Sequence, residues 1–250
     1  MRFFIQFSYF GKAYHGWQYQ PNAITVQEVL EKGMSKLLNV PISLMGAGRT
    51  DTGVHAKVMY AHFDVNRLDN IPEYIFRLNS FLPSDIAVDR IFEVKDDAHA
   101  RFHATSRTYE YHITKKKDPF SSDLAHFIKK ELDLEQMNMA ANLLLGKKDF
   151  ECFSKSNTDV FTNICDLQKA EWTLENNTLV FTITADRFLR NMVRAIVGTL
   201  LNVGLGKYSA DYVNTILKSK DRTKAGVSVP AKGLYLTSIV YPNTILHSSF

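Results

Sequence analysis

The sequence is poor in cysteine, with only Cys152 and Cys165 in 250 residues. Two cysteines so far apart cannot build a disulfide framework or a CxxC site, so we expect both to be buried free thiols. Long apolar runs are missing too, because no stretch approaches the roughly 20 residues that cross a bilayer. The amino-terminal residues MRFFIQFSYFGKAYHGW lack the apolar core and cleavage site of a signal peptide. We therefore expect a cytoplasmic protein without a membrane anchor.

Motifs for several kinds of chemistry are incomplete. The segment HARFH (99–103) spaces two histidines as zinc ligands often are, but it lacks the glutamate of the HExxH motif, and no third ligand is evident. No GxSxG turn is present to carry a serine nucleophile. These absences argue against a zinc hydrolase and a serine hydrolase, and we expect no metal.

Positive charge is in slight excess, with 30 Lys and Arg against 26 Asp and Glu, a net charge of +4. This excess alone only weakly favours an acidic partner. The basic residues fall into clusters, however, with aromatic residues such as Tyr109, Tyr111 and Phe188 near them, and this pattern favours nucleic-acid binding. The clusters are Lys115, Lys116 and Lys117; Lys129 and Lys130; Arg187, Arg190 and Arg194; and Lys218, Lys220, Arg222 and Lys224.

Strand and helix patterns alternate along the whole chain. Alternating apolar residues predict strands, and apolar stripes at helical spacing predict amphipathic helices. Thr25 and Glu28 would form a capping box for one helix, and Asp133 would cap another that Gly146 ends. This mixture predicts an α+β fold that two similar halves would build. The predicted strands are 3–9, 58–65, 86–94, 107–114, 168–174, 178–185 and 233–241, and the predicted helices are 25–38, 72–82, 133–145 and 187–206.

The helix predicted over 187–206 carries Arg187, Arg190 and Arg194 at positions i, i+3 and i+7, which would share one face. Arg187 and Arg190 are compatible with an exposed row whose stems lie on apolar surface. Arg194 falls in a very apolar part of the sequence, where a charge is costly unless a carboxylate or phosphate meets it. We therefore expect an anionic partner for Arg194, and Asp51 is a candidate.

The stretch GAGRTDTGVHA (46–56) places three glycines around one carboxylate, Asp51. Glycines permit tight turns, cradles for anions and frames around reactive side chains. A phosphate-binding P-loop would need Lys and Ser or Thr where Val54 and His55 stand, and Asp51 itself occupies the third glycine position of the dinucleotide motif. Two interpretations remain: a surface turn with a salt bridge between Arg49 and Asp51, or a frame around a reactive aspartate.

This stretch resembles the active-site signature of the tRNA pseudouridine synthases of the TruA family. The resemblance extends over nearly the whole chain, through YFGKAYHGWQYQP, ARFHATSRTYEYHI, RFLRNMVRAIVGTL and PAKGLYLTSIVY. It implies isomerisation of uridine to pseudouridine at positions 38, 39 and 40 in the anticodon stem-loop of tRNA, by a homodimer without cofactor or metal. The fold that it implies has two fused ferredoxin-like (RRM-like) halves with mostly antiparallel sheets around a central basic active-site cleft. The predicted halves are residues 1–106 and 107–250.

The resemblance also implies roles for individual residues. Asp51 matches the catalytic aspartate, and Arg49 matches the arginine of the same loop. Tyr109 matches the tyrosine that stacks on the target uracil, and Arg194 matches the helix arginine that holds the aspartate. The clusters suggest further RNA contacts from Arg187, Arg190, Lys115, Lys116 and Lys117.

The chain departs from the family pattern at Phe10, Lys12 and Lys148, where an aspartate, a threonine and a histidine are common. These departures leave the catalytic set intact and bear on RNA contacts.

Two other functions fit the same residues. One is a noncatalytic RNA-binding module in which the glycine-rich stretch binds the RNA backbone, and the other is a pseudouridine synthase for another RNA.

Overall fold

The computed structural model describes residues 1–155 and 161–247. The chain forms two compact units, a first unit of Met1–Thr105 with Leu236–Phe250 and a second unit of Ser106–Tyr235. The predicted boundary lies between residues 106 and 107, whereas these units divide the chain between Thr105 and Ser106. The residues from Leu236 onward group with the first unit, so its chain is not continuous in sequence.

The first unit is built on a sheet in the order β4-β1-β3-β10. Its central strand β1 pairs antiparallel with both β3 and β4, and a bulge interrupts each ladder near Phe7. Phe3, Phe4, Ile5 and Phe7 are all buried, so both faces of β1 are covered at Phe3–Ile5, because successive side chains of a strand point to opposite faces. The strands are β1 (Arg2–Tyr9), β2 (Met45–Gly46), which pairs with β3, β3 (His55–Asp64), β4 (Ile86–Val94) and β10 (Leu234–Val240).

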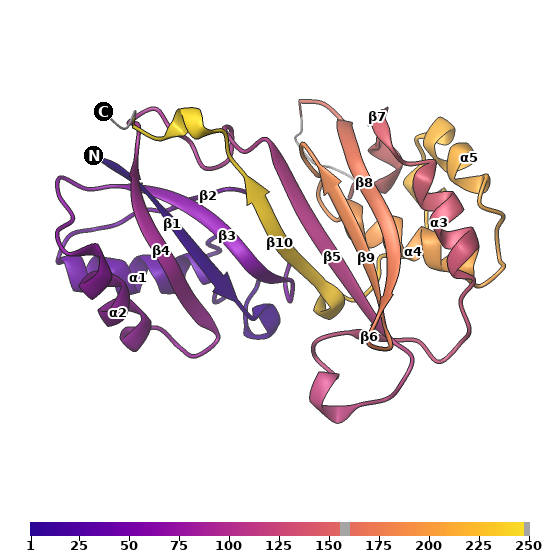
Figure 1. The fold of residues 1–250 in the computed structure, drawn as a ribbon, viewed down its shortest axis with the longest axis horizontal. Helices are drawn as coiled ribbons and strands as arrows, with labels where there is room; N and C mark the ends of the chain where they lie inside the picture. The colour runs from indigo at the N-terminus through magenta and orange to yellow at the C-terminus, as the bar shows by residue number, and fades with distance from the viewer. Residues whose placement is uncertain (156–160, 248–250) are drawn as a thin grey trace. The chain divides into compact units, whose positions relative to one another are not determined.

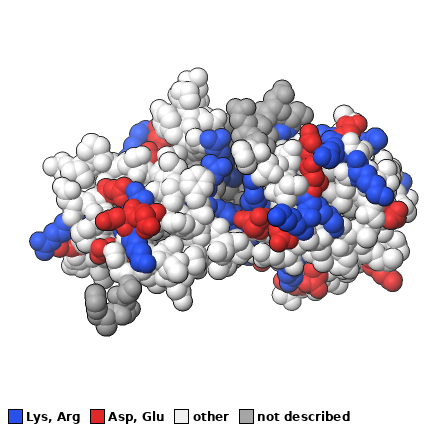
Figure 2. Space-filling model, turned by 90° about the horizontal axis from the view of Figure 1, so that it is seen from above, with Lys and Arg blue, Asp and Glu red and all other residues white. Residues whose placement is uncertain are grey.

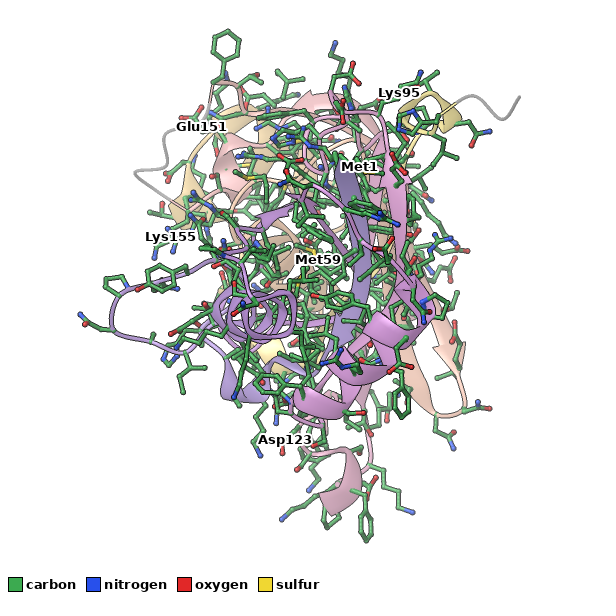
Figure 3. All side chains as sticks on the ribbon, turned by 90° about the vertical axis from the view of Figure 1, so that its left-hand side faces the viewer. Met1, Met59, Lys95, Asp123, Glu151 and Lys155 are labelled. Carbon is green, nitrogen blue, oxygen red and sulfur yellow. The ribbon has the colours of Figure 1, made fainter. Side chains whose placement is uncertain are left out.

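Two helices lie together on one side of this sheet, α1 (Val26–Leu38) and α2 (Ile71–Phe81) (Figure 1). Oγ1 of Thr25 accepts the backbone N–H of Glu28 at 3.4 Å, so the predicted cap of α1 is present. Figure 3 shows Met59 of β3 among the packed side chains, and Met59 is fully buried. The core of the first unit therefore lies between the helices and the sheet.

The second unit contains the part of the sheet with the order β5-β9-β8-β7, with short β6 parallel to β5 and the other pairs antiparallel. Helices α3, α4 and α5 gather beside it (Figure 1). The strands are β5 (Ser106–Thr114), β6 (His126–Phe127), β7 (Gly146–Asp149), β8 (Ile164–Glu175) and β9 (Thr178–Ala185). The helices are α3 (Leu134–Asn142), α4 (Met192–Gly204) and α5 (Tyr212–Ser219).

Short 3-10 turns connect several of these elements. They span Gly11–Ala13, Pro119–Ser121, Glu151–Phe153, Arg222–Lys224, Ala231–Gly233 and Asn243–Ile245. Helices and mostly antiparallel strands thus occur in both units, which agrees with the predicted α+β class. Among the described residues, no helix is long and apolar enough to cross a membrane.

The helix predicted over 187–206 begins later than expected, at Met192. Asn191 takes a left-handed conformation with φ of 66°, which a continuing α-helix does not permit. Oδ1 of Asp186 accepts the backbone N–H groups of Arg187 at 2.7 Å and of Asp166 at 2.8 Å, so the preceding residues are tied to β8. The prediction that Arg187, Arg190 and Arg194 share a helical face is therefore wrong, because only Arg194 lies in α4.

The two cysteines are free and buried, as predicted. Burial raises the pKa of both the Cys152 and the Cys165 thiols to about 12. At neutral pH both are protonated, and a protonated thiol is a poor nucleophile and a poor metal ligand. Neither cysteine is therefore a candidate for the chemistry of the protein.

Candidate active site

The residues 46–56, which we call the aspartate loop, lead from β2 into β3 in the first unit. The side chain of Asp51 is half-buried in this loop, and Arg49 is exposed. The turn closes through the Asp51 carbonyl, which accepts the N–H of Val54 at 3.1 Å, and Gly53 has φ of 77°.

Residues 9–17, which we call the clamp segment, pack against the aspartate loop so closely that three glycines are required. A Cβ at Gly11 would lie 1.9 Å from the carbonyl oxygen of Val54, and one at Gly16 would lie 2.2 Å from that of Thr50. A Cβ at Gly46 would lie 2.4 Å from Nε1 of Trp17. A side chain at any of these three positions would clash with backbone atoms or with the Trp17 ring, and the loop around Asp51 is firmly held.

Tyr109 lies on β5 of the second unit, where its backbone pairs with Ile183 of β9. Its half-exposed ring meets that of Phe188 edge to face, with centroids 5.2 Å apart and an interplanar angle of 88°. Tyr111 follows on the same strand face and is fully buried, and its hydroxyl donates to the carbonyl of Pro230 at 2.9 Å. The packing of Phe188 and of β9 thus fixes the ring of Tyr109 in direction while leaving part of it accessible.

Arg194 lies in the first turn of α4 and is half-buried, not deep in a helix as the sequence suggests. Its Nε donates to the carbonyl of Val229 at 2.7 Å, and the N–H of Val229 donates to the Arg194 carbonyl at 3.2 Å. Burial raises the pKa of Tyr111, and the positive charge of Arg194 partly opposes that rise. The segment Val229–Pro230 therefore brings the arginine helix and the tyrosine strand together, a link that no local sequence pattern predicts.

The other predicted RNA contacts lie in the second unit and do not form one cluster by hydrogen bonding. Arg187 is half-buried beside Asp186, and Arg190 is exposed. Lys115, Lys116 and Lys117 are exposed in sequence after β5, and Lys115 is ion-paired with Glu131. These residues are accessible to a partner.

The histidines of HARFH take part in a local turn. Nδ1 of His103 accepts the N–H of His99 at 3.1 Å, and Nδ1 of His99 accepts the N–H of Arg101 at 3.1 Å. In the part of the chain that the structure describes, no group of three or more His, Cys, Asp or Glu residues is placed to hold a metal ion. The histidines therefore serve the backbone of the turn.

The structure thus holds Asp51 half-buried in the aspartate loop of the first unit, and Tyr109 and Arg194 half-buried in the second unit. Residues 5–103 and 140–242 match the family described as tRNA pseudouridine synthase. The chain belongs to this family, and it is therefore an isomerase that converts uridine to pseudouridine in tRNA.

Named relatives cover almost the whole chain. A protein named tRNA pseudouridine synthase A from Parabacteroides distasonis is 51% identical over 247 residues, which cover 98% of this chain and 97% of the relative. Proteins of the same name from Bacteroides fragilis and Francisella tularensis are 51% and 38% identical. The alignment with the Bacteroides fragilis protein covers 98% of this chain and 98% of the relative. The alignment with the Francisella tularensis protein covers 96% of this chain and 94% of the relative.

Proposed function

We propose that the protein isomerises uridine at positions 38, 39 and 40 in the anticodon stem-loop of tRNA and that Asp51 is its catalytic residue. The observation that carries this proposal is the aspartate loop: a chain of this family holds a single half-buried carboxylate in a loop whose backbone packs directly on Gly11 and Gly16 of the clamp segment. The relatives named tRNA pseudouridine synthase A support the reaction on tRNA.

The reaction needs no oxidant, reductant or water, because product and substrate are isomers. The bond between N1 of uracil and C1′ breaks, the base turns, and a bond between C5 and C1′ forms. C5 loses a proton and N1 gains one. One carboxylate near C1′ is sufficient for two routes: Asp51 attacks C1′ as a nucleophile, or it removes the 2′ proton to give a glycal. The proton from C5 passes either to Asp51 or to the hydroxyl of Tyr109.

Tyr109 is proposed to stack on the uracil once the nucleotide has left the helix stack. Flipping a nucleotide costs a few kcal/mol, and stacking on an aromatic ring returns about 1–3 kcal/mol. The half-exposed ring that Phe188 orients supports this role. Since stacking roughly balances the flipping cost, contacts to phosphates must supply the net affinity for tRNA.

Arg194 is proposed to hold the Asp51 carboxylate in position, since a guanidinium and a carboxylate form strong, directional charge-assisted hydrogen bonds. The resemblance of the RFLRNMVRAIVGTL segment to the family supports this role. The hydrogen bond from Nε of Arg194 to the Val229 carbonyl fixes the position of the guanidinium, a group whose shape matches that of a carboxylate. Asp51 and Arg194 together form the proposed catalytic pair.

Arg49 is proposed to hold the backbone of the flipped nucleotide or to fill the vacated stack. Its exposure beside Asp51 in sequence supports this role. Arg49→Ala should lower kcat/KM on tRNA by about 10-fold or more, since a hydrogen bond to a charged group contributes about 1.5–3 kcal/mol. Single-turnover assays check this, with Arg67→Ala, an exposed arginine paired with Asp69, as the control. Unaltered turnover of Arg49→Ala would remove Arg49 from the site.

Lys115, Lys116 and Lys117, with Arg187 and Arg190, are proposed to bind phosphates. On the face shown in Figure 2, lysine and arginine side chains stand among acidic ones, so no single charge covers it. Replacing the three lysines with serine should weaken tRNA binding and lower the salt dependence of log K by about 1 for each phosphate that the variant no longer neutralises. Filter binding at several salt concentrations checks this. The control is Lys32→Ser, which removes a lysine paired with Glu28, and an unchanged slope in the triple variant would contradict the proposal.

The two units are proposed to be ferredoxin-like halves around a basic active-site cleft, in a cytoplasmic homodimer. Phe120 is 93% exposed in the second unit, and Leu124 and Phe127 are also exposed on the same segment. Exposed large apolar side chains that occur close together commonly mark a protein interface, and a second copy of the chain would cover them. This segment supports the proposed homodimer.

The two alternative functions predict different results with the same tRNA. A noncatalytic RNA-binding module would bind tRNA without forming pseudouridine, and a synthase for another RNA would leave positions 38 to 40 unmodified. The test uses tRNA transcripts that carry uridine at these positions and matched transcripts that carry cytidine there. Product in the first set alone supports the proposal, and equal product in both sets would contradict the proposed positions.

A further inference from the structure

The hydroxyl of Tyr9 is buried beside the residue that precedes Asp51. Tyr9 ends β1 with 4% of its surface exposed, and its Oη lies 2.8 Å from Oγ1 of Thr50. The carbonyl of Thr50 also accepts the N–H of Trp17 at 3.4 Å. The same carbonyl oxygen lies so close to Gly16 that a Cβ there would be 2.2 Å from it. Thr50 is therefore held through both its side chain and its backbone, directly next to the carboxylate.

The clamp segment also holds the residues that follow Asp51. The N–H of Gly53 donates to the carbonyl of Tyr14 at 3.2 Å. Nδ1 of buried His55 accepts the N–H of Gly11 at 2.9 Å, and the imidazole stacks on Phe10 with centroids 4.5 Å apart and planes 11° from parallel. Contacts on both sides of Asp51 thus restrict how its backbone can turn.

The strand and the segment that make these contacts are themselves held in place by the rest of the first unit. Tyr9 belongs to β1, which has paired strands on both sides. The clamp segment is tied to the residue before β4, because Asp85 accepts the Phe10 N–H at its carbonyl, at 2.8 Å, and the Tyr14 hydroxyl at Oδ1, at 2.6 Å. A reacting group needs supports of this kind to stay within a fraction of an ångström of its working geometry.

We propose that Tyr9 is a positioning residue for the reaction: its hydroxyl, acting through Thr50, sets the direction of the Asp51 carboxylate. The inference rests on the proposed role of Asp51. Packing does not require the hydroxyl, since the ring of Tyr9 stacks on Phe7 with centroids 6.2 Å apart and phenylalanine would preserve that contact. A buried hydroxyl is costly to leave unpaired, so the hydrogen bond fixes the orientation of Thr50. Displacing a reacting group by about 1 Å can cost on the order of 100-fold in rate.

Tyr9→Phe should lower kcat on tRNA by about 10- to 100-fold, while KM changes by less than about 3-fold, because the buried residue contacts no RNA. Thr50→Val should have the same effect, and Thr50→Ser, which retains a hydroxyl, should keep most of the activity. Tyr9→Phe combined with Thr50→Val should lose no more than either single variant, since both remove one shared hydrogen bond. All rates are measured well below the thermal unfolding temperature of each variant, so that a loss of stability alone leaves kcat unchanged.

The matched control is Tyr235→Phe, which removes a tyrosine hydroxyl that donates to the Leu124 carbonyl within the second unit. Wild-type kcat in Tyr9→Phe, or losses that multiply in the double variant, would overturn the inference. Asp51→Asn is assayed in the same series. If it retains activity, the proposed role of Asp51 fails; if it is inactive while Tyr9→Phe matches wild type, only the positioning role fails.

Discussion

Asp51→Asn should abolish pseudouridine formation, with the single-turnover rate on tRNA falling by about 10³-fold or more. Asparagine retains the size and shape of aspartate, but its amide can neither attack C1′ nor take the proton from C2′. Backbone groups, Thr50 and His55 form contacts between the clamp segment and the loop that the substitution leaves in place, so the loop should keep its conformation. Affinity for tRNA should be retained or slightly increased, since a negative charge is removed near an anionic ligand.

Asp64→Asn is the matched control for this loss. Asp64 is an exposed carboxylate of the same unit, paired with Arg2 at 2.8 Å, and its replacement should leave the rate on tRNA unchanged. Rapid quench followed by pseudouridine detection gives the rates, and equilibrium binding gives the affinities. An Asp51→Asn variant that binds tRNA and forms product at the wild-type rate would show that the reaction uses another group.

Tyr109→Ala should lower kcat/KM on tRNA by about 5- to 150-fold, which corresponds to the roughly 1–3 kcal/mol that one base gains by stacking on an aromatic ring. Tyr109→Phe keeps the ring and its edge-to-face contact with Phe188, so it should retain the stacking contribution. Any rate loss that remains in Tyr109→Phe then measures the hydroxyl, one of the two proposed acceptors of the C5 proton. Steady-state kinetics of both variants separate these contributions.

Tyr208→Ala controls for the removal of an accessible ring from the second unit. Tyr208 is 41% exposed and stacks on Tyr212, and we expect its removal to leave kcat/KM unchanged. Equal kcat/KM for wild type and Tyr109→Ala would exclude stacking of Tyr109 on the reacting base.

Strands and helices with regular apolar spacing were predictable from the sequence. The strand predicted over 86–94 coincides with β4, and the helix predicted over 25–38 with α1 and its Thr25 cap. The start of α4 was not predictable from the sequence. Leu189 fits the apolar stripe of a helix, whereas the turn at Asn191 depends on the backbone torsion of that residue. The strand β7 (GKKD) has no alternation of its own and is defined by pairing with β8.

Residue types in the candidate site were also predictable, since the aspartate loop and the tyrosine strand carry family motifs. The contacts that hold those residues in place were not predictable, because they join distant parts of the chain. The hydrogen bond between Tyr9 and Thr50 spans 41 positions, and the one between Arg194 and Val229 spans 35. No local pattern records such contacts. The close approach of the clamp segment to the aspartate loop is reflected in the sequence by Gly11 and Gly16, because close approach of two backbones excludes a side chain.

The decisive experiment for the role of Asp51 is pseudouridine mapping on tRNA transcripts, with wild type and Asp51→Ala in parallel and without added metal or nucleotide. We expect modification confined to positions 38 to 40 by the wild type and none by Asp51→Ala, with tRNA bound by both. Modification by Asp51→Ala would contradict the role of the carboxylate. A wild-type protein that binds tRNA but modifies none of these positions would contradict the proposed reaction site.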